Sequence, residues 1–304
     1  IAWLPWAVQY FFFIGIAASA SVIAVILRLW KKGELRELEL LIVGIGITAG
    51  IVGPIALLAD LHQPGRFFNF YIQAAHWSWM WIGALFVPLF VGLIIVQFWL
   101  LLRENTTKEG TFKWFRVLHW WNYNPTKWLP ITSVALLAVS FMILLYTGKE
   151  VNVLKSQPIW HTPWLPWVLF FTAFQAVPMC VKTWSTWSTK WAKRGAYTAI
   201  LSRVQLIGLL GVAICLIGWA MSDSPAGAAF RDLPNKGSVW FTIGLSIFIY
   251  WVVLMTYTLV NFNTRRINCK WIDLLLSLGS LSLAWTIRWA ILMQSQTLPK
   301  YNVV

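Results

Sequence analysis

The sequence has little charge for its length. Only 11% of its 304 residues are Asp, Glu, Lys or Arg, whereas a soluble domain carries about 25%. Hydrophobic residues make up 59% and the mean hydropathy is +0.67. Apolar runs of about 20 residues, each long enough to cross a bilayer, recur along the whole chain. No run alternates apolar and polar residues with a period of two, which excludes an outer-membrane β-barrel. These features predict an all-α integral membrane protein.

Cysteine and histidine are also scarce. The three cysteines, Cys180, Cys215 and Cys269, lie far apart and form no Cys-x-x-Cys pair. An iron–sulfur cluster is held by about four thiolates, and a disulfide framework needs paired cysteines. A b-type haem usually takes a pair of histidines from within helices, but the four histidines of this chain fall in loops or at the ends of apolar runs. They are His62, His76, His119 and His161. We therefore expect no haem, no iron–sulfur cluster and no metal in this chain.

Eight apolar runs are long enough to span a membrane. We place them at residues 6–30, 38–60, 77–102, 128–148, 162–184, 200–220, 237–262 and 271–292. We expect two four-helix bundles, residues 1–148 and 162–292, and a C-terminal extension, residues 293–304. The first span lacks a basic leader and a small-residue cleavage site, so it does not resemble a cleaved signal peptide. Because the sequence opens on Ile1 rather than Met, we expect a few residues to precede it.

The net charge of +14 is unevenly distributed. Lys and Arg crowd the connections at residues 31–36, 103–127, 182–194 and 265–270, whereas the alternate connections carry few of them. Cytoplasmic loops of membrane proteins are enriched in Lys and Arg. The basic excess therefore predicts that these connections are cytoplasmic and that both termini lie outside. It does not indicate nucleic-acid binding.

The tetrapeptide WLPW occurs twice, at residues 3–6 and 164–167. Each copy precedes an aromatic-rich span, and four spans separate the two, so both copies enter the membrane from the same side. The pattern suggests a parallel repeat of two four-helix units. The other interpretation is that Trp and Pro are simply common at membrane interfaces and helix starts.

Polar side chains are concentrated where the predicted second span ends. The stretch ALLADLHQPGRFF, residues 56–68, places an acid, an imidazole, an amide and a guanidinium directly after a long apolar run. Ionisable groups at membrane depth are costly, so each of them suggests a function. Other polar residues lie at span ends that face the same side in this topology. The whole set is Gln9, Tyr10, Asp60, His62, Gln63, Arg66, Asn69, His76, Tyr146, Lys149 and Glu150.

If the first four spans form one bundle, these groups converge at its outer mouth, which suits the oxidation of a quinol. Removing two protons and two electrons from a quinol requires a base near each hydroxyl. Asp60 stands between an apolar helix end and a guanidinium, both of which tune its acidity, and His62 titrates near neutrality. We predict that Asp60 and His62 accept the protons and that Tyr146 and Gln9 bind the ring oxygens.

Other interpretations of the stretch at residues 56–68 stay open. Asp60 and Arg66 can form a plain ion pair across a Pro-Gly turn, and His62 can cap the second span. A transporter or channel is the alternative from another functional class. It would be expected to carry ion ligands near the membrane midplane, and no acid lies in the middle of a predicted span.

The polar residues elsewhere also have structural interpretations. His76 and His161 are more often interfacial residues than ligands. Glu150 and Lys149 can form a solvated pair at a helix end. Arg288, the deepest ionisable residue, can be a structural cation bound to backbone carbonyls.

Several stretches, in order along nearly the whole chain, resemble the membrane subunits of polysulfide reductase and its relatives, the NrfD-like family. Within it they look most like the membrane subunits of bacterial tetrathionate reductases. These stretches are WLPWAVQYFFFIGIA (3–17), ADLHQPGRFFNFY (59–71), WSWMWIGALFVPLF (77–90), YTGKEVNV (146–153) and QSQTLPKYN (294–302).

The resemblance implies a multi-pass anchor in the bacterial inner membrane that oxidises menaquinol or ubiquinol near the periplasmic face, where both ends of the eight-helix unit lie. The implied partners are a periplasmic iron–sulfur subunit and a molybdopterin catalytic subunit that reduces tetrathionate to thiosulfate in anaerobic respiration. This chain is then the quinol-oxidising subunit, and acceptor reduction takes place elsewhere. The anchor of a related polysulfide, thiosulfate or other oxyanion reductase is the alternative within the family.

The resemblance also implies the site residues. The quinone-binding set is Gln9, Tyr10, Asp60, His62, Gln63, Arg66 and Tyr146, and Asn69, His76, Lys149 and Glu150 lie behind it. Two features depart from the family pattern. Some relatives supply a histidine from the first span, where this chain has Gln9 and Tyr10, and the tetrathionate reductase relatives look longer at the carboxyl end, with a ninth span beyond the position of Val304.

Overall fold

The computed structural model describes residues 4–31, 33–61, 63–72, 76–105, 123–187, 194–263 and 269–298. Eight long helices dominate this part of the chain: α1 (Pro5–Lys31), α2 (Arg36–Asp60), α4 (Trp79–Asn105), α5 (Pro125–Asn152), α6 (Leu165–Trp187), α7 (Arg194–Met221), α9 (Ser238–Val260) and α10 (Lys270–Leu292). The connections carry the short helices α3 (Asn69–Ile72) and α8 (Pro225–Asp232) and the 3-10 turns η1 (Pro64–Arg66), η3 (Pro158–Trp160), η4 (Leu233–Lys236) and η5 (Gln294–Thr297). All eight long helices have the length and apolar composition of a membrane span, which confirms the predicted all-α membrane fold.

Proline and capping residues define several helix starts. Asn124 accepts a hydrogen bond from the backbone N–H of Thr126 at 3.0 Å, directly before the proline that opens α5. Ser224 does the same for Gly227 at 3.2 Å, before the proline that opens α8. Such caps satisfy backbone donors that have no partner in the first helical turn. Residues 4–6 of the first WLPW copy and the whole of the second copy lie at the starts of α1 and α6, as the sequence predicts.

Helices α1 and α6 lie at the centre of the molecule. Of the 18 most apolar consecutive residues of each helix, 89% are buried in α1 and 83% in α6, against 17–44% in the other six helices. Helix α1 packs against α2 and α5, which in turn pack against α4, whereas α6 packs against α7 and α10, which both contact α9. Helix α1 also contacts α6 and α10. Because this central contact joins the two sets of four helices, their division into two separate bundles stays a prediction.

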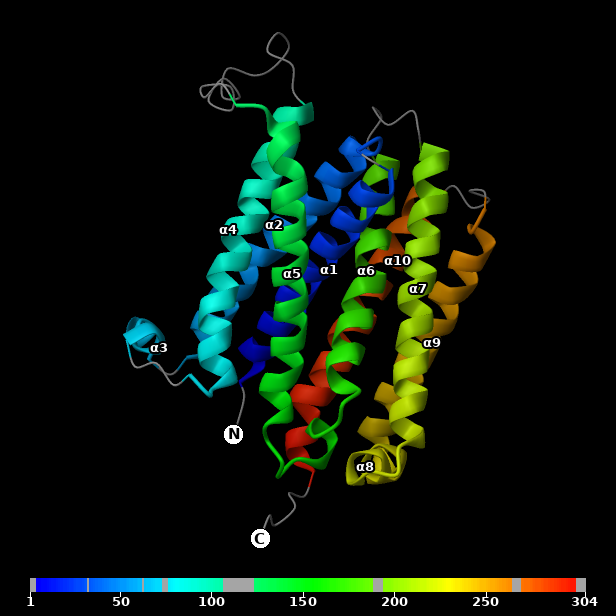
Figure 1. The fold of residues 1–304 in the computed structure, drawn as a ribbon. Coiled ribbons are helices and arrows are strands. Elements are labelled where there is room, and N and C mark those ends of the chain that lie inside the picture. Colours follow the sequence, from blue (N-terminus) through cyan, green and yellow to red (C-terminus); the bar gives the residue numbers. More distant parts are fainter. Residues whose placement is uncertain are drawn as a thin grey trace.

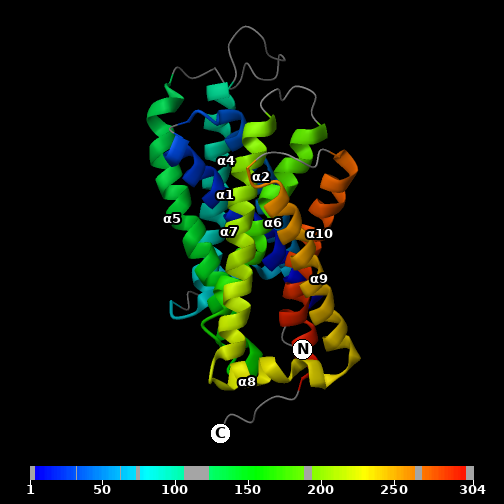
Figure 2. The same ribbon diagram turned by 90° about the vertical axis from the view of Figure 1, so that its right-hand side faces the viewer.

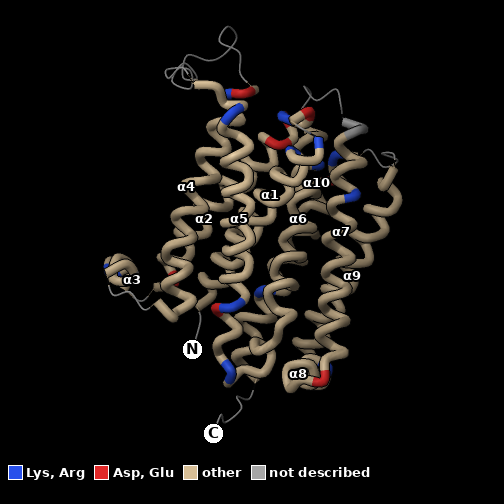
Figure 3. The backbone as a smooth tube through the Cα atoms, viewed as in Figure 1, with Lys and Arg blue, Asp and Glu red and all other residues tan. Residues whose placement is uncertain are grey.

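The chain begins α1 and ends α10 at the same end of the molecule, the lower end in Figure 1. We call this the terminal end and the other the opposite end. Lys, Arg, Asp and Glu of the described residues gather near these two ends, and the middle of the helices carries almost none (Figure 3). This distribution is the one expected of a protein that spans a membrane. That the terminal end is periplasmic stays a prediction.

Arg288 of α10 is an exception among the charged residues, because its side chain is completely buried. Its guanidinium donates to the carbonyl oxygen of Phe11 on α1 at 3.0 Å and to that of Leu169 on α6 at 2.6 Å. It also donates to Thr172 Oγ1 at 3.0 Å and to the Ala284 carbonyl oxygen at 2.8 Å. Arg288 therefore ties three helices together, and its interpretation as a structural cation bound mainly to backbone carbonyls is confirmed.

Ion pairs near the opposite end join α1, α2 and α4. Arg28 of α1 contacts Glu39 of α2 at 2.7 Å and Glu104 of α4 at 3.1 Å. Glu39 is almost fully buried, and a buried carboxylate needs such a partner. Removing the arginine would leave two acids close together.

The other four long helices are joined by a polar cluster near the same end. Lys182 of α6 donates to Gln205 Oε1 of α7 at 2.9 Å. Tyr257 of α9 donates a short hydrogen bond to Asp273 of α10. All four side chains are buried, so polar contacts as well as apolar packing fix how these helices meet.

Candidate functional site

Three of the predicted site residues meet in the interior near the terminal end. Tyr10 comes from α1, and Tyr146 and Glu150 come from α5, where the i,i+4 spacing places both on one helix face. All three are buried, with exposed fractions of 0% for Tyr10, 3% for Tyr146 and 7% for Glu150. The Tyr146 side chain lies within interaction range of both Tyr10 and Glu150. The sequence thus brings two phenols and a carboxyl group together at membrane depth.

Two polar atoms of this cluster have no hydrogen-bond partner among the described residues. They are the Tyr10 hydroxyl and Glu150 Oε2, and both are buried. Nearly all buried polar groups in proteins are hydrogen-bonded, and each exception requires an explanation. A ligand hydroxyl, which accepts from the Tyr10 phenol and donates to the Glu150 carboxylate, would satisfy both atoms.

A second carboxyl group lies close to the first. Asp60 is the last residue of α2 and is half-buried. It lies near enough to interact electrostatically with Glu150. The cluster therefore contains two acids from different helices, which is the number of bases that a two-proton oxidation needs.

Close backbone approach fixes the position of Tyr146. The ring packs against Gly83 of α4, where a Cβ atom would collide with the phenol. A neighbouring glycine, Gly148, is packed against Pro166 of α6 in the same way. Small residues allow helices in membranes to approach closely. Here the two glycines allow α4 and α6 to pack tightly against α5, with the Tyr146 phenol on the side of α1.

The segment that follows α2 is outside this cluster. Helix α3 projects sideways beside α4 near the terminal end (Figure 1). Gln63, Arg66 and His76 are exposed, and the His76 and Trp81 rings form a T-shaped contact with a centroid distance of 4.6 Å. Arg66 forms no ion pair with Asp60, since the ion pairs among the described residues lie elsewhere.

The remaining predicted residues are placed as follows. Gln9 and Asn69 are half-buried and Lys149 is exposed. The solvated pair of Glu150 with Lys149 is wrong, because Glu150 is buried while its neighbour faces outward. His161 is exposed, and its Nδ1 lies 3.0 Å from the carbonyl oxygen of Asn152. His62 and His119 lie outside the described residues.

The described residues contain no group of three or more His, Cys, Asp or Glu side chains that could hold a metal ion. The three cysteines are not bonded to one another.

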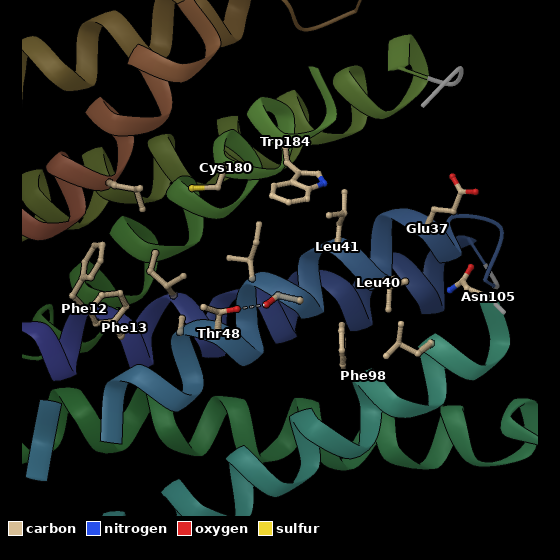
Figure 4. Close-up of a pocket in the computed structure, with 16 residues that line it drawn as sticks. Phe12, Phe13, Glu37, Leu40, Leu41, Thr48, Phe98, Asn105, Cys180 and Trp184 are labelled. Atoms are coloured by element: carbon tan, nitrogen blue, oxygen red, sulfur yellow. Dashed lines mark hydrogen bonds between the residues drawn. The ribbon is translucent and has the colours of Figure 1, made fainter. Parts of the chain in front are cut away.

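A large groove lies away from the cluster, on the side of α2 that faces α6. It has a volume of about 990 Å³ and runs from Phe12 to Glu37 and Asn105 near the opposite end (Figure 4). Its lining is mainly apolar, and the Thr48 hydroxyl within it already donates to the Gly44 carbonyl. None of the predicted quinone-site residues lines it.

The whole chain matches known proteins. Residues 1–300 match the family model described as polysulphide reductase, NrfD. A tetrathionate reductase subunit from Salmonella typhimurium is 37% identical over 99% of this chain and 82% of its own length. A selenate reductase subunit from Mesobacillus selenatarsenatis is 20% identical over 57% of this chain and 45% of its own length.

Proposed function

Because the chain belongs to the NrfD polysulfide reductase family, we propose that this membrane subunit of a reductase complex oxidises a quinol at the cluster of Tyr10, Tyr146, Glu150 and Asp60. The relatives support a role in a reductase complex, since both proteins described above are reductase subunits. The observation that carries the proposal is the buried Tyr10 hydroxyl and Glu150 Oε2, which have no hydrogen-bond partner among the described residues.

The residues of the cluster fit a quinol ring chemically. Each ring hydroxyl donates one hydrogen bond and accepts another, which matches a carboxylate on one side and a phenol on the other. Tyr10 and Tyr146 orient one hydroxyl group of the quinol ring. Glu150 accepts the proton of the hydroxyl group that lies beside it. Asp60 accepts the second proton. The apolar residues around the cluster exclude water, which strengthens these hydrogen bonds.

Protons and electrons leave the site by different routes. The two protons pass through Glu150 and Asp60 to the terminal end, which we propose to be periplasmic. His62, directly after α2, relays the second proton. The two electrons pass to a periplasmic iron–sulfur subunit and from there to a molybdopterin catalytic subunit. With menaquinol or ubiquinol as the substrate, proton release on this side adds nothing to the membrane potential.

We propose tetrathionate as the terminal acceptor, reduced to thiosulfate in the catalytic subunit during anaerobic respiration. The similarity to a tetrathionate reductase subunit over nearly the whole chain supports this choice over selenate, where the similarity covers 57% of the chain. The present chain then anchors the complex in the bacterial inner membrane.

An Asp60→Asn variant tests the proposal. An amide cannot accept a proton, so tetrathionate reduction driven by a quinol should fall by about 10²-fold or more in the purified complex, since a positioned acid or base contributes about 10²–10⁴. Reduction driven by a soluble viologen, which bypasses the membrane subunit, should stay unchanged. His62→Ala should lower the quinol-driven rate less, because a relay is easier to replace than the acceptor.

Two results would contradict the proposal. Full quinol-driven activity in Asp60→Asn and His62→Ala would mean that the end of α2 has only a structural role. Equal loss with both donors, in a complex that keeps all its subunits, would mean that the substitution acts on the partner subunits instead.

A further inference from the structure

A separate hollow lies among α7, α9 and α10 at the terminal end. It has a volume of about 450 Å³, within the range of about 300–1,000 Å³ that is usual for ligand pockets. Helix α8 crosses the ends of α7 and α9 (Figure 2) and closes the hollow together with η4. Ile217 and Phe248 line it and are also more than half exposed, so it opens sideways where the membrane would lie.

The walls of the hollow are apolar. Val212, Leu216, Trp240 and Ile291 are typical of the lining. Two of the three indole N–H groups in the wall are already used. Trp219 donates to the Ala226 carbonyl at 3.3 Å and Trp251 donates to the Leu209 carbonyl at 2.9 Å. These two donors are not available to the ring oxygens of a quinone, and the apolar lining as a whole favours an alkyl chain.

A glycine in the wall keeps the hollow open. Gly244 lies in the second turn of α9, and a Cβ atom there would meet nothing within 4 Å. By contrast, a Cβ atom at Gly218 of α7 would come within 2.6 Å of Trp164. Glycine is a poor helix former. Helix packing explains Gly218 but not Gly244, whose missing side chain leaves space for a ligand.

A positively charged residue is next in the sequence to one that lines the hollow. Arg231 follows Phe230, which lines the hollow, and is exposed. Its Nη1 donates to the Ala220 carbonyl at 2.6 Å and to the Ser222 carbonyl at 3.0 Å, which fixes the guanidinium in place. The neighbouring Asp232 is paired with Lys236 at 2.8 Å. Among the described residues, Arg231 has no carboxylate partner, and guanidinium groups bind phosphate well.

We propose that this hollow binds one membrane phospholipid, with an acyl chain between α7, α9 and α10 and the phosphate against Arg231. The lipid comes from the leaflet at the terminal end and enters through the side opening. It joins α8 and η4 to the long helices beneath them. This site is separate from the quinol cluster, which lies among the first four long helices, and it does not depend on the proposed quinol chemistry.

A Gly244→Leu variant tests the site, because a Cβ atom there meets nothing within 4 Å and the added side chain takes up space in the hollow. The purified complex in detergent is analysed by native mass spectrometry, and the phospholipid and quinone extracted per complex are counted. The variant should lose one tightly held phospholipid and keep its quinone content. Gly92→Leu is the matched control, since a Cβ atom at Gly92 of α4 also meets open space but lies outside this hollow.

Two results would overturn the proposal. The phospholipid count of Gly244→Leu could equal that of Gly92→Leu, or the variant could lose a quinone instead of a phospholipid, which would assign the hollow to an isoprenoid chain. If Gly244→Leu fails to assemble, Arg231→Gln decides the question, with the exposed Lys155→Gln as its control. Arg231→Gln should retain less phospholipid through detergent washing, and equal retention in these two variants would also overturn the proposal.

Discussion

A Glu150→Gln variant of the assembled complex should lose quinol-driven tetrathionate reduction by roughly 10²-fold or more, the contribution of a positioned general base, and should keep the viologen-driven rate. Glu150 is 7% exposed and one of its oxygen atoms has no hydrogen-bond partner among the described residues. An amide has nearly the same shape as the carboxyl group but cannot take up the proton of a quinol. The effect should therefore fall on the chemical step, with a lower kcat for the quinol and a similar KM.

Two further variants distinguish the loss of proton transfer from a change in the structure. Glu150→Asp keeps the acid with a shorter reach and should recover part of the activity that the amide loses. Lys155→Gln changes an exposed residue five positions away and should leave quinol-driven turnover unaltered. If Glu150→Gln oxidises quinol at the original rate, Glu150 is not the proton acceptor, and the unsatisfied oxygen has a purely structural explanation.

The fold is largely predictable because the bilayer imposes strong constraints on a sequence. A membrane span needs about 20 apolar residues, so composition alone locates eight helices, and the observed ends differ from the predicted ones by a few residues. For example, the span expected at 38–60 is observed as Arg36–Asp60. The connections contain structure that hydropathy does not indicate. The short helix α8 is amphipathic and lies across two helix ends, and it is too short to register as a span.

The candidate site is only partly predictable. The sequence indicates that polar residues at several span ends face one side, which places Tyr10, Tyr146 and Asp60 in the predicted set. It does not indicate the central position of Glu150, since the adjacent Lys149 suggests a solvated pair. The two residues point about 100° apart around the helix, and only the packing of α5 determines which of them faces inward. The signal that could have found Glu150 is its i,i+4 spacing from Tyr146.

Long-range packing decides the remaining contacts. The approach of Tyr146 to α4 depends on Gly83, which lies more than 60 positions earlier in the chain. Neither residue indicates the other in the sequence. Similarly, Arg66 is six positions from Asp60, yet it is exposed in the segment that leaves the helix bundle beside α4. The roles of Arg66 and of His62 in the quinol site stay predictions.

The second large effect is expected at Arg288, where Arg288→Lys should destabilise the protein more than Arg288→Met. The guanidinium reaches α1, α6 and α10 at once through four hydrogen bonds. An ammonium group is a compact point charge and cannot span the same acceptors. Lysine would therefore stay buried with its charge while losing two or more bonds, each worth about 1.5–3 kcal/mol when one partner is charged.

Methionine distinguishes a structural cation from a residue that is only needed to fill space. Arg288→Met removes the buried charge together with its hydrogen bonds, and replacing buried charge by an apolar side chain is often tolerated. The measurement is the midpoint of heat-induced loss of the folded complex, followed by size-exclusion chromatography, for wild type, Arg288→Lys and Arg288→Met. The midpoint should fall in the order wild type, Met, Lys. If lysine is as stable as arginine, the contacts to Phe11 and Leu169 do not hold α1 and α6 together, and apolar packing alone positions the helix that carries Tyr10.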